Sequence, residues 1–92
     1  MTAAPLPARL TPYLALMRAF AEERITGAEF ETVYLALFKD DSTQRDQRTY
    51  EVLARLFHDV DDYFPGQTDQ ERETADATLR EQVRRSIVDL TS

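Results

Sequence analysis

The 92-residue sequence contains no cysteine and no tryptophan, and it has a single histidine, His58, and two glycines, Gly27 and Gly66. The absence of cysteine excludes disulfides, thiolate nucleophiles and sulfur-ligated metal sites. The two glycines are isolated, and no Walker, Rossmann, Gly-x-Ser-x-Gly or His-Glu-x-x-His pattern is present. We therefore expect neither phosphate-cradling nor motif-defined nucleophilic chemistry, and no cofactor.

Long apolar runs are missing as well. No stretch approaches the ~20 apolar residues that span a bilayer, and residues 1–9 lack the charged start and apolar run of a signal peptide. We expect a cytoplasmic protein without membrane contact, with a flexible tail over residues 1–9 and a single domain over residues 10–92. A chain this short buries only roughly 60–70% of the surface that it exposes when unfolded, so a deep active-site cleft is not expected.

The acidic residues are concentrated in one part of the chain. Seven of the 17 acidic residues lie between positions 59 and 76, whereas Arg72 is the only one of the 11 basic residues in this range. The acidic and basic residues in the rest of the chain are equal in number. The seven acids are Asp59, Asp61, Asp62, Asp69, Glu71, Glu73 and Asp76. Such a patch attracts a cationic partner over about a Debye length, ~8 Å at physiological salt, and it repels nucleic acid.

Apolar residues recur with the 3.6-residue period of a helix in four segments. The first helix is predicted at about residues 12–24 with Pro12 at its start, and the second begins at a capping box formed by Thr26 and Glu29. A connection of one or two residues should make these helices an antiparallel hairpin. The residues expected to be buried are Leu10, Tyr13, Leu14, Met17, Phe20, Ala21, Phe30, Val33, Tyr34, Leu37 and Phe38.

The third helix is predicted to start near Asp46, after a polar connection over residues 39–47, and to end at Pro65-Gly66. A second polar loop, residues 66–76, should then lead to the last helix. The apolar positions are Tyr50, Leu53, Leu56, Phe57, Val60 and Phe64 in the third helix, and Leu79, Val83, Ile87 and Leu90 in the last.

Three arginines, Arg80, Arg84 and Arg85, are expected in the later turns of the last helix, where the macrodipole favours cations. No segment shows the alternating pattern of a β-strand. The predicted fold class is all-α, a small antiparallel four-helix bundle.

The stretch HDVDDYFP, residues 58–65, combines the histidine with three acids and two aromatics. His58 could work with Asp61 or Asp62, three and four positions on, as a general acid or base; the alternative is an exposed histidine whose charge the carboxylates favour. An EF-hand starting at Asp59 fails at three positions, which need a ligand, a glycine and a bidentate glutamate. Weak cation binding and an ordinary solvated acidic face stay open.

Helical geometry divides these residues between faces. Successive residues of a helix are rotated by about 100°, and we measure their directions from the centre of the stripe formed by Leu53, Phe57 and Val60. On this basis Asp59 and Asp62 point to solvent. Asp61 and Tyr63 lie on opposite shoulders of the stripe, where Tyr63 could half bury its ring and keep its hydroxyl free. Acids at a helix C-terminus oppose the macrodipole, and such local conflicts tend to mark functional sites.

Three blocks carry a family resemblance: LMRAFAEERITGAEFETVYLALFKDD, YEVLARLFHDVDDYF and the less specific LREQVRRSI. Together they make about residues 10–90 resemble the colicin D immunity protein family, the self-protective colicin-like immunity proteins. The resemblance implies a small four-helix bundle without enzymatic activity. It also implies a 1:1 complex with the catalytic domain of a cognate nuclease toxin that cleaves transfer RNA, in the cytoplasm of the producing cell.

In that family an acidic surface covers the basic active site of the toxin. The resemblance therefore implies Asp59, Asp61, Asp62 and Tyr63 as the inhibitory face, with Asp40 and Asp41 as secondary contacts. The connection before the last helix departs from the family pattern by being longer and more charged. Its acids Asp69, Glu71 and Glu73 are either partner contacts or part of a solvated loop.

Two other functions compete with this interpretation. The first is a non-enzymatic acidic helical module that binds another basic protein or forms a homodimer, whereas an immunity protein should be a monomer when free. The second is a small enzyme that uses His58. Binding to a colicin-type nuclease would distinguish the immunity function from both.

Overall fold

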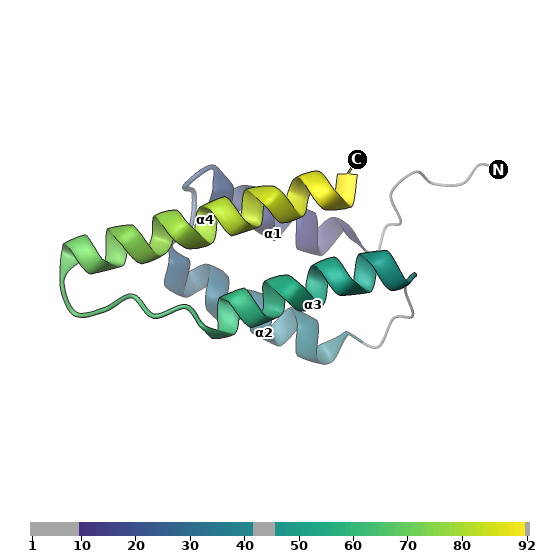
Figure 1. The fold of residues 1–92 in the computed structure, drawn as a ribbon, viewed down its shortest axis with the longest axis horizontal. Coiled ribbons are helices and arrows are strands. Elements are labelled where there is room, and N and C mark those ends of the chain that lie inside the picture. Colours follow the sequence, from purple (N-terminus) through teal and green to yellow (C-terminus); the bar gives the residue numbers. More distant parts are fainter. Residues whose placement is uncertain (1–9, 42–45, 92) are drawn as a thin grey trace.

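The computed structural model describes residues 10–41 and 46–91. They form the α-helices α1 (Thr11–Ala21), α2 (Gly27–Asp40), α3 (Gln47–Asp61) and α4 (Asp69–Thr91). Each helix packs against the next in alternating direction, and α4 returns to pack against α1 (Figure 1). The predicted all-α antiparallel four-helix bundle is confirmed. The predicted tail, residues 1–9, lies outside the described residues.

Aromatic and aliphatic side chains fill the centre of the bundle. The rings of Phe20 and Phe30 stack with centroids 4.8 Å apart and join α1 to α2. The buried Tyr34 hydroxyl donates a hydrogen bond of 2.8 Å to the carbonyl oxygen of Leu53 and joins α2 to α3. The core also contains Leu10, Tyr13, Leu14, Met17, Val52, Leu56, Val60, Leu79 and Val83. Three residues that were expected to be buried, Val33, Tyr50 and Phe64, are exposed instead.

The connection between α1 and α2 is longer than predicted. The helix α1 ends at Ala21 because Glu23 adopts a left-handed backbone conformation, with φ of 62°. The N–H groups of Glu23 and Arg24 then bond to the carbonyl oxygens of Phe20 and Ala19, which is a Schellman motif. Residues 22–26 therefore form the turn. The predicted capping box at the start of α2 is confirmed, since the Thr26 and Glu29 side chains each accept the other's backbone N–H.

The boundaries of α3 and α4 combine a correct prediction with two wrong ones. Asp46 caps α3 as predicted, with its carboxylate accepting from the Thr49 N–H at 3.1 Å. However, α3 ends at Asp61, before Pro65-Gly66. The predicted loop over residues 66–76 is mostly helix, because α4 starts at Asp69. The first turns of α4 extend past the ends of the other three helices (Figure 1).

Two arginines near the middle of α4 hold this helix against α1. Arg80 donates to the carbonyl oxygen of Phe20 at 3.2 Å, and Arg84 donates to that of Ala21 at 3.3 Å. The Arg80 guanidinium also lies 4.9 Å from the centroid of the Phe20 ring. The expectation that these cations complement the end of their own helix is wrong. They instead complement the C-terminal carbonyls of α1, where a positive charge is equally favourable.

Candidate protein-binding surface where α3 meets α4

Two unneutralised acids occupy the C-terminal end of α3. Asp61 is the last residue of the helix and Asp62 is its C-cap. Both are exposed, and within residues 10–41 and 46–91 their carboxylates form neither a hydrogen bond nor an ion pair. Placed beside the negative end of the α3 dipole, they raise the free energy of the folded state. The expectation that Asp61 lies on the shoulder of the buried stripe is wrong.

Asp59 is half buried, although helical geometry predicted that it points to solvent. The structure buries Val52 and Leu56 together with Leu53 and Val60, which moves the centre of the buried face by about 50° toward Asp59 at 100° per residue. Burial raises the pKa of Asp59, and the Asp62 carboxylate adds to this, whereas Arg55 and Arg85 lower it. The carboxylate of Asp59 is thus partly desolvated without an ion-pair partner among the described residues.

Tyr63 follows the helix and is half buried as predicted, but its hydroxyl is not free. The hydroxyl donates a hydrogen bond of 2.5 Å to Oδ1 of Asp76 on α4. Burial first, and then the Asp76 carboxylate, raise the pKa of the phenol. Gly27 of α2 lies directly against this pair, since a Cβ added there would be 2.3 Å from the Asp76 carboxylate oxygen and 2.5 Å from the Tyr63 hydroxyl.

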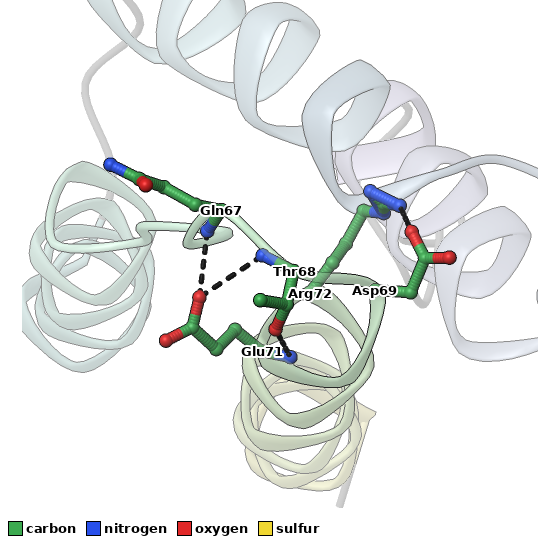
Figure 2. A network of polar contacts seen from close by, with 5 residues as sticks. All are labelled: Gln67, Thr68, Asp69, Glu71 and Arg72. Carbon is green, nitrogen blue, oxygen red and sulfur yellow. Dashed lines mark hydrogen bonds and ion pairs between the residues drawn. The ribbon is translucent and has the colours of Figure 1, made fainter.

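The acids at the start of α4 have local structural partners. The Glu71 carboxylate accepts from the backbone N–H groups of Gln67 at 2.7 Å and Thr68 at 3.1 Å, and the Thr68 hydroxyl accepts from the Glu71 N–H (Figure 2). This second capping box was missed, although its Thr-x-x-Glu pattern can be read in the sequence. These backbone bonds lower the pKa of Glu71. Asp69 pairs with Arg72, as Figure 2 also shows.

The secondary candidates lie at the other end of the bundle. Asp40 is the last residue of α2 and is exposed, and Asp41 is its C-cap. The Asp41 carboxylate accepts from the Tyr13 hydroxyl at 2.7 Å. Because α2 and α3 are antiparallel, both acids lie far along the bundle from the end of α3 (Figure 1). The structure therefore does not bring them together with Asp59, Asp61 and Asp62.

An exposed aromatic residue, Phe64, lies among these acids. Phe64 is 72% exposed, more than any other large hydrophobic residue that the structure describes. It lines a hollow of about 300 Å³ between the end of α3 and α4. It also borders a second hollow of about 610 Å³ beside the start of α4. The sequence placed Phe64 on the buried stripe of a longer helix, and the early end of α3 is the reason for the error.

His58 does not form the acid–base pair that its position allowed. It is exposed, and its ring makes an edge contact with Phe57, with centroids 5.8 Å apart. Among the described residues its imidazole makes no hydrogen bond to the carboxylate of Asp61 or Asp62. No three His, Asp or Glu side chains in the described part of the chain converge as metal ligands would.

A family model described as bacterial self-protective colicin-like immunity matches residues 9–90, nearly the whole chain. The chain belongs to this family. Comparison with curated proteins and with solved structures finds no match. The family relation agrees with the resemblance carried by the sequence blocks and with the four-helix fold.

Membership of the colicin-like immunity family gives the coarse function. The chain is a toxin-immunity protein, and its partner is a cognate toxin. Such proteins are inhibitors, so their functional surface is a contact face. None of the described helices is both long and apolar enough to cross a membrane.

Proposed function

We propose that this protein inhibits a nuclease toxin, of the colicin D type that cleaves transfer RNA, by covering the basic active site of the toxin. The contact face consists of Asp59, Asp61, Asp62 and Tyr63, together with Phe64. The observation that carries this assignment is the pair of unneutralised carboxylates at the C-terminal end of α3. Their position costs stability in the free protein, and a cationic partner would remove that cost.

The other candidate acids take smaller parts in this proposal. Asp69 and Glu71 already serve the start of α4, so they contribute to the negative field more than to direct contacts. Asp40 and Asp41 lie outside the principal contact, at the opposite end of the α2–α3 pair. The free protein is a monomer that binds the toxin 1:1 in the cytoplasm of the producing cell, with no cofactor and no catalysis.

The physical demands on such an inhibitor support the assignment. Protection against a lethal nuclease needs fast capture, and complementary charge raises association rates to about 10⁸–10⁹ M⁻¹ s⁻¹ at low salt. A preformed helical bundle also loses little conformational entropy when it docks. Charge sets the association rate more than the residence time, so slow release needs a desolvated anchor as well.

Co-expression with a panel of colicin-type nuclease domains, including the one encoded nearest to this gene, tests the function. We expect the wild type to restore growth against one domain, and the purified pair to show no cleavage of transfer RNA. Asp61→Asn with Asp62→Asn should lose protection, whereas Glu51→Gln on the far part of α3 should keep it. Failure of the wild type to bind or block any nuclease would refute the proposed function.

A further inference from the structure

Phe64 is held in its exposed position by bonds on both sides. Before it, the Tyr63 hydroxyl is tied to Asp76 of α4. After it, the Gln67 N–H donates to the Glu71 carboxylate at 2.7 Å, and Gly66 makes the turn with φ of 76°. A large aromatic ring on a tethered segment can be buried by a partner with little loss of conformational entropy, which is a property of binding hot spots.

The hollow between α3 and α4 has two chemically different walls. Asp59 and Asp62 line it from α3, and Ala75 and Leu79 line it from α4, with Phe64 at one side. A carboxylate pair next to an apolar wall suits a side chain with an apolar stem and a cationic head. The partly buried Asp59 has a raised pKa and no ion-pair partner among the described residues, so a bound cation would compensate its lost hydration.

The second hollow lacks these properties. Its only charged lining residue is Glu71, and that carboxylate already caps α4. The remaining lining residues are Phe64, Gly66, Thr68, Gln70, Thr74 and Ala75. It therefore offers no free charge to a cation, and it serves as an internal comparison for the first hollow.

We propose that the hollow between α3 and α4 receives one arginine side chain of the partner, with its guanidinium between Asp59 and Asp62 and against the ring of Phe64. This inference rests on the proposed function, which supplies a basic partner. Arginine fits better than lysine because its planar guanidinium can bridge two carboxylates and stack on an aromatic face. Phe64 is then a specificity-determining residue, because a toxin without an arginine at this point loses the anchor.

A titration that needs no toxin tests the hollow directly. The ¹⁵N-labelled protein is titrated with N-acetyl-arginine amide, and with N-acetyl-citrulline amide as its uncharged isostere. We expect millimolar binding of the arginine compound only, with amide shifts concentrated at Ala75, Thr78 and Gln82 and lost in Asp62→Asn. Equal shifts with citrulline, or shifts spread evenly over all acidic residues, would overturn the inference.

Paired variants then test the hollow in the toxin complex. Thr78 lines only the first hollow and Thr74 only the second, and both are exposed on α4 one turn apart. Thr78→Met should fill the first hollow and speed toxin dissociation at least tenfold, as should Phe64→Ala, whereas Thr74→Met should not. Tyr50→Ala, at another exposed aromatic, is the second control.

The outcomes separate the two proposals. If the wild type inhibits a toxin and both Phe64→Ala and Thr78→Met release it at the wild-type rate, the arginine hollow is wrong and the immunity mechanism stands. If no nuclease binds the wild type, the proposed function fails, and the arginine titration still decides whether the hollow selects a guanidinium.

Discussion

Asp61 and Asp62 lie at the C-terminal end of α3, where the last carbonyl oxygens of the helix already carry partial negative charge. Each acid in such a position costs from a few tenths to about 1 kcal/mol at low salt. Neither carboxylate forms an ion pair with a described residue that would offset this. Selection for binding explains acids here better than selection for stability does, because lysine or arginine would stabilise the helix end.

The charge reversals Asp61→Lys and Asp62→Lys should therefore stabilise the free protein while they abolish protection. We expect each to raise the free energy of unfolding by roughly 0.3–1 kcal/mol in low-salt urea denaturation. Asp69→Lys at the start of α4 is the control of opposite sign, since an acid is favourable there. A loss of stability in the α3 variants would mean that these acids support the fold.

The contact among Gly27, Tyr63 and Asp76 leaves no room for a larger residue on α2. We expect Gly27→Ala to break the Tyr63–Asp76 hydrogen bond and to destabilise the protein by about 1–3 kcal/mol, the usual cost of a lost partly buried bond. Tyr63→Phe removes one of the two clashing oxygens, so Gly27→Ala should cost less in that background. A double-mutant cycle in urea measures this coupling. Additive effects would show that Gly27 and Tyr63 do not interact.

At the scale of helices, the end of α1 illustrates a motif made with an unfavourable residue. Glu23 occupies the left-handed position that glycine normally takes in a Schellman motif. We expect Glu23→Gly to raise the free energy of unfolding by about 1 kcal/mol, or roughly 4–8 °C in melting temperature for a domain of this size. Glu23→Gln removes the charge but keeps the strain, so it should give no such gain. Equal gains in both variants would assign the effect to charge.

Periodicity predicted the helices wherever an apolar face exists, and failed where none does. The capping boxes at Thr26 and Thr68 have the same Thr-x-x-Glu pattern, but only Thr26 precedes an apolar run. The first turns of α4 extend past the bundle and bury almost nothing, so their helix leaves no hydrophobic pattern (Figure 1). Caps and local bonds hold this segment, and they are visible in sequence only as short motifs.

The candidate site was predicted less well than the fold, for a similar reason. The sequence identified Asp59, Asp61 and Asp62, because a run of acids at a helix end is a local feature. Which of them is partly buried depends on α4, which lies beside Val52 and Asp59 of α3. The exposure of Phe64 depends on where α3 stops. The partial burial of Asp59 and the exposure of Phe64 are therefore set by packing between helices. A helical wheel drawn for one helix carries no information about that packing.

At the scale of the whole molecule, the antiparallel arrangement gathers the acidic part of the chain at one end. The end of α3 and the first half of α4 lie at the same end of the bundle, so the acids between residues 59 and 76 form one field (Figure 1). Arg80 and Arg84 of α4 lie at the end of α1, where backbone carbonyl oxygens accept hydrogen bonds from their guanidinium groups. Among the described residues, neither arginine forms an ion pair with an acid of residues 59–76.

The association rate with the toxin should accordingly fall as salt rises, because the Debye length shrinks from about 30 Å at 0.01 M to about 8 Å at 0.15 M. Stopped-flow measurements over this range should show a steep slope for the wild type. Neutralising Asp61, which does not line the arginine hollow, should flatten the slope and slow association without a comparable change in the dissociation rate. Phe64→Ala should instead speed dissociation and leave the association rate and its salt slope nearly unchanged, since an aromatic contact forms only after encounter. A salt slope that Asp61→Asn with Asp62→Asn leaves unchanged would place the steering charge elsewhere on the molecule.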